Sequence, residues 1–234
     1  MGSIPHEGGV SFRLWAPNAE FVSLIGSFNN WDKQADPMAK EKDGYWATDI
    51  APAKLGDEYR YFLKNGSFET TRIDPYAREV TNTVGNAIIC KSEFDWGADK
   101  FQLAPINELV IYEMHVGTFG EGKDASVRTF QAAAEKLGYL RRLGINAIEI
   151  MPVSQFAGDR SWGYNPSNLF AVDTNYGGPV ALKELVKAAH QQGIGVLIDV
   201  VYNHFGPSDL DLWQFDGWSE NGKGGIYFYN DWRA

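Results

Sequence analysis

The sequence of 234 residues holds a single cysteine, Cys90, and no long apolar run. One thiol cannot form an internal disulfide, so the chain fits a reducing compartment. No apolar stretch approaches the roughly 18 residues that a membrane span requires, and the N-terminus lacks the regions of a signal peptide. We therefore expect a cytoplasmic protein with no membrane partner.

Positive charge is also scarce. The sequence has 21 Lys and Arg against 30 Asp and Glu, a formal net charge of −9. Nucleic-acid binders concentrate basic residues against phosphates, so this balance argues against a nucleic-acid partner. The 44% hydrophobic and 14% aromatic content is enough for a sizeable core in one or two domains. A neutral ligand fits this composition better.

The first part of the chain, 1–103, has short apolar runs closed by Pro, Gly or Asn, which is typical of an all-β domain. Residues Tyr59–Lys64 alternate in character, and Asn65-Gly66 follows them. Asn-Gly after an alternating run is the strongest short hairpin signal, because turn positions need positive φ. Several strands at this spacing predict an immunoglobulin-like β-sandwich.

From Leu109 the pattern changes to alternating strands and helices. The predicted elements are strand Leu109–His115, helix Ser126–Arg142, strand Ile145–Met151, helix Val180–Gln191 and strand Ile194–Ile198. This βαβαβ order predicts a parallel sheet of the α/β class. With a linker near Pro105, we expect two domains, 1–103 and 108–234.

Polar side chains follow the third predicted strand. The hexapeptide Asp199–His204 places a carboxylate, the amide of Asn203 and an imidazole at a strand end, where α/β barrels carry their chemistry. Taken alone, these residues would have a purely structural explanation, in which Asp199 caps backbone amides and His204 is an ordinary loop residue. However, Trp162 and Tyr164 follow the second strand on the same rim. Aromatic rings beside polar groups suit sugars, whose C–H faces stack on rings.

Five segments occur in collinear order: Tyr112–Phe119, Ala147–Val153, Ser161–Tyr164, Tyr176–Gly178 and Asp199–His204. They resemble glycoside hydrolase family 13, the α-amylase family. Upstream lie Phe12–Asn18, Gly26–Trp31 and Asp74–Arg78, which are similar to the carbohydrate-binding module of family 48. The resemblance implies a TIM (β/α)8 barrel, and 35 residues follow Asp199 (234 − 199), too few for five more strand–helix units. We expect a chain truncated after the third barrel strand.

The resemblance also implies roles for the rim residues. His204 would hydrogen-bond the sugar at the cleavage position, and Asp199 would help fix a later catalytic arginine and nucleophile. Tyr164 would stack under the same sugar, with Trp162 and Asn203 as further substrate-binding residues. Asn203 matches a calcium ligand of α-amylases, but branching enzymes usually lack that ion, so we expect no metal and no cofactor.

The catalytic carboxylates are missing from the sequence. Retaining glycosidases need two carboxyl groups about 5–5.5 Å apart, and the resemblance places both on later strands. The nucleophile motif Gly-x-Arg-x-Asp does not occur. Glu149 lies below its strand end and fits a packed barrel interior, as do Glu113 and His115. We therefore expect Tyr164, Asp199 and His204 on one rim, Glu149 lower, and no activity from this chain alone.

Two aromatic-rich regions remain open in function. In the first domain, Trp31, Arg60, Phe68 and Asn86 match the glucan-binding positions of family 48, although such modules also serve as docking domains with aromatic cores. The last segment, 208–234, holds seven aromatic side chains, which suit a subdomain core as well as a sugar platform.

The combined interpretation is an α-glucan-active enzyme fragment, most like a 1,4-α-glucan branching enzyme with a retaining mechanism. Its partners would be an α-glucan such as glycogen, starch or a maltooligosaccharide, and either a second copy or the missing half of the barrel. A maltooligosyltrehalose trehalohydrolase is the alternative, because Gln131–Leu137 and Asn203–Pro207 also resemble those enzymes. A non-catalytic glucan-binding chain is the alternative from another class.

Overall fold

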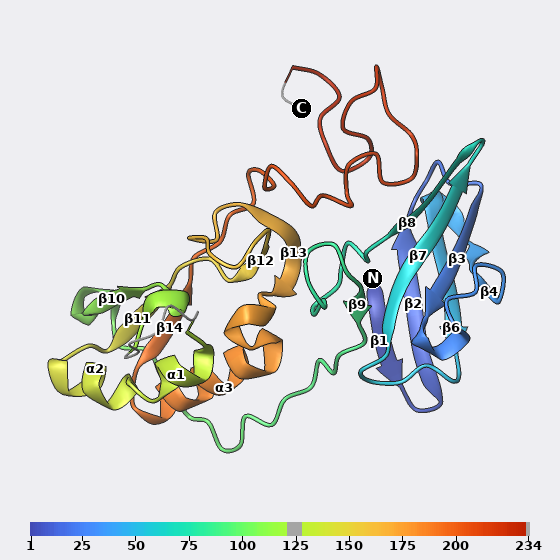
Figure 1. Cartoon of the computed structure of the whole chain (residues 1–234). Coiled ribbons are helices and arrows are strands. Elements are labelled where there is room, and N and C mark those ends of the chain that lie inside the picture. Colours follow the sequence, from blue (N-terminus) through green and yellow to red (C-terminus); the bar gives the residue numbers. More distant parts are fainter. Residues whose placement is uncertain (121–127, 233–234) are drawn as a thin grey trace. The chain divides into compact units, whose positions relative to one another are not determined.

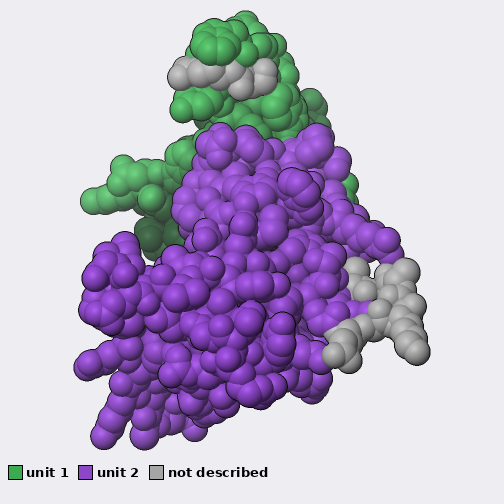
Figure 2. Space-filling model, turned by 90° about the vertical axis from the view of Figure 1, so that its left-hand side faces the viewer, with its two compact units in different colours: residues 1–91, 209–234 green, residues 92–208 purple. Residues whose placement is uncertain are grey.

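The computed structural model describes residues 1–120 and 128–232. It contains two compact units, 1–91 with 209–234, and 92–208 (Figure 2). The units differ from the expected domains at both boundaries. Residues 92–103 belong to the second unit because Lys183 and Lys187 donate to Ser92 O and Asp95 O, at 2.9 and 2.7 Å. Residues 209–234 belong to the first.

The first unit contains two antiparallel sheets, which face one another in Figure 1. One sheet has the order β1 (Gly2–His6), β2 (Gly9–Trp15), β6 (Tyr45–Ile50) and β5 (Ala39–Lys40). The other has the order β4 (Asp36–Pro37), β3 (Phe21–Gly26), β7 (Glu58–Asn65) and β8 (Phe68–Arg72), with β9 (Ala87–Ile88) also on β7. Two 3-10 turns, η1 (Ser27–Asn29) and η2 (Lys42–Gly44), link strands. The predicted sandwich is confirmed.

The predicted hairpin joins β7 to β8, but its turn lies one residue later than predicted. Asn65 pairs with Phe68, which leaves Gly66 and Ser67 as the central turn residues. Of these two, Gly66 alone has a positive φ, +56°. Positive φ at the first central position alone is the pattern of a type II′ turn, which favours glycine there.

The core of the sandwich contains a buried carboxylate. Asp74 is 1% exposed, and its Oδ2 accepts a hydrogen bond from Tyr59 Oη at 2.5 Å. Its Oδ1 accepts from Tyr76 N at 2.8 Å. The Tyr59 ring meets Phe12 of the opposite sheet edge-on at 5.0 Å. Burial raises the pKa of Asp74, although these hydrogen bonds oppose the shift.

The second unit is built on a parallel sheet with the order β10 (Ile111–Met114), β11 (Ala147–Ile150) and β14 (Gly195–Ile198). The chain between them forms η4 (Val116–Thr118), α1 (Phe130–Ala134), α2 (Leu137–Leu143), η5 (Thr174–Tyr176) and α3 (Gly178–Gln191), after η3 (Ile106–Glu108). The predicted first helix is thus two short helices, and part of it lies outside the described residues. A hairpin of β12 (Ser154–Phe156) and β13 (Pro166–Val172) was not predicted.

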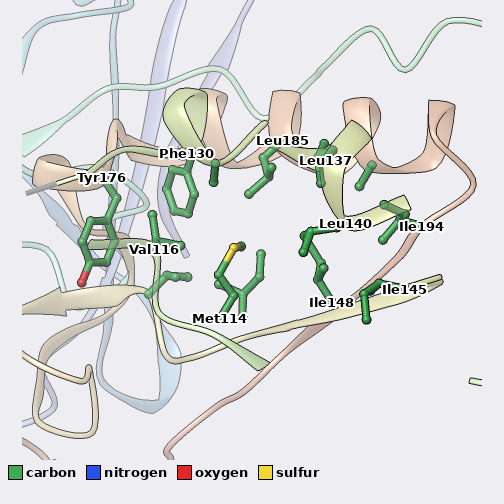
Figure 3. Close-up of a cluster of buried hydrophobic side chains, with 14 of the residues drawn as sticks. Met114, Val116, Phe130, Leu137, Leu140, Ile145, Ile148, Tyr176, Leu185 and Ile194 are labelled. Atoms are coloured by element: carbon green, nitrogen blue, oxygen red, sulfur yellow. The ribbon is translucent and has the colours of Figure 1, made fainter. Parts of the chain in front are cut away.

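The two faces of this sheet differ in character. Met114 and Ile148 pack beneath the helices against Phe130 and Leu140 (Figure 3). Ile150 belongs to the same buried cluster. The other face carries, in one row, Glu113, Glu149 and Leu197. Helices therefore cover one side, while the other side carries acidic groups, as in the first three strands of an α/β barrel. No helix within 1–120 or 128–232 has the length and apolarity to cross a bilayer.

The buried carboxylate predicts how the stability of the sandwich depends on pH. The pKa of Asp74 is higher in the folded state than in the unfolded chain. The stability that Asp74 contributes to the folded state is therefore fully present below about pH 4 and is lost as the pH rises through the folded pKa. Between the pKa values of the unfolded and folded states, the loss is about 1.4 kcal/mol for each pH unit. We expect wild type to lose stability relative to Asp74→Asn as the pH rises from 4 to 8.

Urea unfolding at a series of pH values, followed by tryptophan fluorescence, measures this difference. Asp49→Asn is the matched control, because the Asp49 side chain is 75% exposed. Parallel curves for wild type and Asp74→Asn over the whole range would show that burial does not govern this carboxyl.

Candidate functional site

The site begins with a hydrogen bond between two loops of the second unit. Asp199 follows β14, and its N–H donates to Ile150 O at 2.9 Å, which extends the parallel ladder by one residue. Tyr164, between β12 and β13, donates its Oη proton to Asp199 Oδ2 at 2.6 Å. This bond brings together two of the predicted site residues at the carboxyl end of the sheet.

The phenol of Tyr164 lies in a negative environment. The hydrogen bond to Asp199 raises the pKa of Tyr164 to about 12, and partial burial and the charges of Asp199, Glu113 and Glu149 add to the shift. The strand register places Glu149 one side-chain row before Asp199 on the same face. Tyr164 is therefore a neutral hydrogen-bond donor over the physiological pH range, held beside a group of carboxylates.

A tight turn holds Tyr164 in place. Gly163 has φ +89°, and a Cβ on it would collide with Pro152 O. Gly163 N donates to Ser161 Oγ at 3.0 Å, and Ser161 Oγ also hydrogen-bonds the Asn165 side chain. Glycine is required at position 163 because any larger residue would push the turn away from the strand end.

His115, immediately after β10, supports the same turn. Its Nε2 lies 2.8 Å from Ser161 O and 3.3 Å from Tyr176 Oη, while its Nδ1 lies 3.0 Å from Thr118 Oγ1. A carbonyl only accepts, so Nε2 carries a proton and donates to Ser161 O. His115 was expected to pack in the barrel interior, and its support of the Tyr164 turn was missed. Its position after a strand end was the available signal.

The other predicted residues of the rim are exposed. Trp162 is 71% exposed, and Asn203 and His204 also lie at the surface. His204 Nδ1 is 3.1 Å from Phe205 O, and the adjoining Gly206 N donates to Pro166 O at 2.8 Å. The loop with His204 therefore runs beside the loop with Tyr164. In the described part of the chain, no group of three or more His, Cys, Asp or Glu could hold a metal ion.

Comparison with known families gives one match in each half of the chain, and the second match extends past residue 208 into the part of the first unit that follows it. Residues 1–77 match carbohydrate-binding module 48, described as the isoamylase N-terminal domain, and residues 114–220 match the α-amylase catalytic domain. The second unit is therefore similar to the α-amylase catalytic domain, and the first to carbohydrate-binding module 48. The second match begins at the end of β10 and extends past the Asp199 loop, so it includes the whole Tyr164–Asp199 site.

Individual relatives extend the same result. The chain is 38% identical, over 86% of its length, to a malto-oligosyltrehalose trehalohydrolase of Saccharolobus solfataricus, of which it covers 34%. It is 35% identical, over 95% of its length, to a 1,4-alpha-glucan branching enzyme GlgB of Aquifex aeolicus, of which it covers 36%. The solved pullulanase of Bacillus acidopullulyticus superposes on 90% of the chain with a TM-score of 0.74, at 27% identity and 31% coverage of that chain. The chain thus spans about a third of the relatives it matches.

The four predicted glucan-binding residues of the module have different environments. The Trp31 side chain is exposed, and its backbone is left-handed with φ +62°. The Asn86 side chain donates to Glu58 Oε2 at 2.7 Å. Arg60 and Phe68 are partly buried against the C-terminal segment of the same unit. Of the four, Trp31 is the residue that is exposed to solvent.

The Tyr164–Asp199 bond predicts a change that can be measured without any substrate. Asp199→Asn removes the charge and weakens the hydrogen bond, so we expect the pKa of Tyr164 to fall from about 12 toward its usual value near 10. Site-specific 3-fluorotyrosine at position 164, titrated by ¹⁹F NMR, reports the change in pKa between wild type and Asp199→Asn, because the fluorine lowers the phenol pKa in both proteins alike. Asp159→Asn is the control, and an unchanged Tyr164 titration in Asp199→Asn would contradict the geometry.

The support from His115 predicts a second, indirect effect on the same signal. His115→Ala removes the donor to Ser161 O, so the turn loosens and the pKa of Tyr164 also falls. His115→Gln, which keeps a donor, should restore most of the shift. If His115 merely stabilised the fold, the alanine variant would unfold at a lower temperature while its Tyr164 titration stayed as in wild type.

Proposed function

We propose that the chain forms the first part of an α-glucan-active enzyme, most like a 1,4-α-glucan branching enzyme. The observation that carries this proposal is the Tyr164–Asp199 pair at the carboxyl ends of parallel strands, in a chain 35% identical to such an enzyme over 95% of its length. Further relatives of 33–37% identity bear the same name. The activity proposed is that of a whole protein about three times as long.

In this proposal the rim residues bind one sugar ring. The hydrogen bond to Asp199 fixes the orientation of the Tyr164 ring, which stacks on the C–H face of the sugar. His204 and Asn203 donate or accept hydrogen bonds to its hydroxyl groups, and Trp162 offers a second ring surface. Asp199 does not act as nucleophile but helps to fix a catalytic arginine and nucleophile that later strands supply.

The reaction proposed is cleavage of an α-1,4 bond with retention, followed by transfer of the glycosyl group to a 6-hydroxyl. Retention requires a nucleophilic carboxylate and an acid/base carboxyl about 5–5.5 Å apart. Because the sequence has no Gly-x-Arg-x-Asp motif, we assign both groups to strands beyond this chain. The 1–234 polypeptide alone is then inactive, and it acts in the cytoplasm only as part of a larger protein or assembly.

The open edges of the sheet support a need for a partner. In the described ranges, β10 and β14 each pair with one strand, β11. Exposed apolar side chains lie at these edges, among them Ile111, Ile198 and Val200. Unpaired edges with apolar neighbours invite pairing, so we propose that the remaining barrel strands or a second copy cover them.

A trehalohydrolase is the second candidate, because the relative with the highest identity among those above, 38%, has that name. The two activities differ in product: branching forms α-1,6 bonds in amylose, whereas the other releases trehalose from its maltooligosyl derivative. Assay of the full-length protein on both substrates separates them. A non-catalytic glucan-binding chain remains the candidate from another class, and absence of either activity in the full-length protein would favour it.

For the isolated chain, we expect binding to maltohexaose without turnover. Tyr164→Ala should weaken binding about 3- to 10-fold, the range that loss of one stacking contact gives. Isothermal titration calorimetry measures the affinity, while iodine staining and reducing-end release measure turnover on amylose. Tyr139→Ala is the matched control, since Tyr139 is exposed on α2. Turnover that Asp199→Asn abolishes would show that this chain holds its own catalytic carboxylates.

A further inference from the structure

One arginine makes several of the contacts that hold the segment Asp209–Gly217, called the docked segment below, within the first unit. Arg72 at the end of β8 donates from Nε to Phe215 O at 3.1 Å. Its Nη2 donates to Trp213 O and Gln214 O, at 3.1 and 3.0 Å. Three successive carbonyl groups thus accept hydrogen bonds from one guanidinium, and Gln214 O also accepts from Gly217 N at 3.0 Å.

Three aspartates of the docked segment add further hydrogen bonds to the module. Asp216 is 0% exposed, and its Oδ2 accepts from Asn18 N and Nδ2 at 2.9 and 3.0 Å. Asp211 accepts from Ile73 N at 2.7 Å and pairs with the Arg60 guanidinium. Asp209 accepts from Thr83 Oγ1 at 2.7 Å. Buried charges are stable only where such partners are present, so these contacts form a specific interface.

Apolar packing fills the space between the polar contacts. Phe215 is fully buried, and Tyr227 meets it edge-on with ring centroids 5.4 Å apart. Gly217, at φ +80°, lies against the Phe68 ring so closely that a Cβ would collide with it. The backbone at Gly217 therefore covers part of the Phe68 ring.

We propose that the β8 edge of the module, which Phe68 and Arg60 reach from opposite faces of the sheet, is the docking surface of the docked segment and not a glucan-binding surface. Stacking of a sugar needs an open ring face, and recognition of its hydroxyls needs free donors. Phe68, the aromatic residue expected to bind glucan, lies against Gly217 of the docked segment. Arg60, the expected cation, pairs with Asp211 of that segment and also donates to the module's own carbonyl groups of Val84, Gly85 and Thr71. This inference does not depend on which reaction the whole enzyme performs.

Limited proteolysis of the 1–234 chain with chymotrypsin tests the docking. Arg72→Ala removes the three carbonyl contacts, so cleavage after Phe215 and Tyr227 should accelerate at least about tenfold, while cleavage after the exposed Tyr229 changes little. Asp211→Asn should also accelerate cleavage after Phe215 and Tyr227. Because this variant keeps the size of the side chain, it provides a second test if Arg72→Ala misfolds. Arg13→Ala is the control, because Arg13 pairs with Glu41 on the other sheet.

Glucan binding by the same proteins tests the second half of the proposal. We expect Phe68→Ala and Arg60→Gln to leave the affinity for maltoheptaose and β-cyclodextrin within twofold of wild type, while both accelerate cleavage after Phe215. A fivefold or greater loss of glucan affinity in either variant, with cleavage after Phe215 unchanged, would overturn the proposal. Equal cleavage rates for Arg72→Ala, Asp211→Asn and wild type would overturn it as well. Tyr164→Ala tests the proposed glucan site separately, because Tyr164 lies in the other unit. Its effect on glucan affinity bears on the rim site and not on the docking of the segment.

Discussion

The parallel register of β10, β11 and β14 is the constraint on which the site depends. Side chains in a strand alternate between faces, so the pairing of Glu113 with Glu149 and Leu197 decides which groups turn away from the helices. The bond from Asp199 N to Ile150 O carries this register one residue past the strand. A slip by one residue would turn Asp199 toward the apolar core and bury its charge without a partner.

The same register places the carboxylates of Glu113, Glu149 and Asp199 on one face of the sheet, and residues of the surrounding loops interact with them. Tyr164 responds with a raised pKa and donates its proton to Asp199. His115, from the first strand, fixes the carbonyl of Ser161 in the turn that carries this tyrosine. The ends of β14 and β10 therefore contribute the carboxylate of Asp199 and the support from His115, while the phenol comes from the loop between β12 and β13. The site is a product of the sheet as a whole.

The sequence predicted what local patterns determine: the sandwich, the three parallel strands and the two loops that meet at Tyr164 and Asp199. The sequence predicted the hairpin after β7 with Asn65-Gly66 at its turn. In the structure Asn65 pairs with Phe68, so the central turn residues are Gly66 and Ser67. The β12–β13 hairpin, with its register shifts, and the support from His115 depend on partners far along the chain. No local periodicity encodes such partners, so sequence patterns alone could not predict them.

The module shows why residue type does not define a binding site. Arginine and phenylalanine suit a sugar because they offer directional donors and an apolar ring, and the same properties seat a loop rich in carbonyls, carboxylates and glycine. The environment decides between these uses. The Arg60 side chain is 14% exposed and ion-paired with Asp211, and Phe68 lies against Gly217, whereas Trp31 remains exposed. A match of residue types therefore predicts a carbohydrate site only where the surrounding chain leaves those side chains open to solvent, and here the polar contacts of Arg72 and Asp216 hold the covering segment in place.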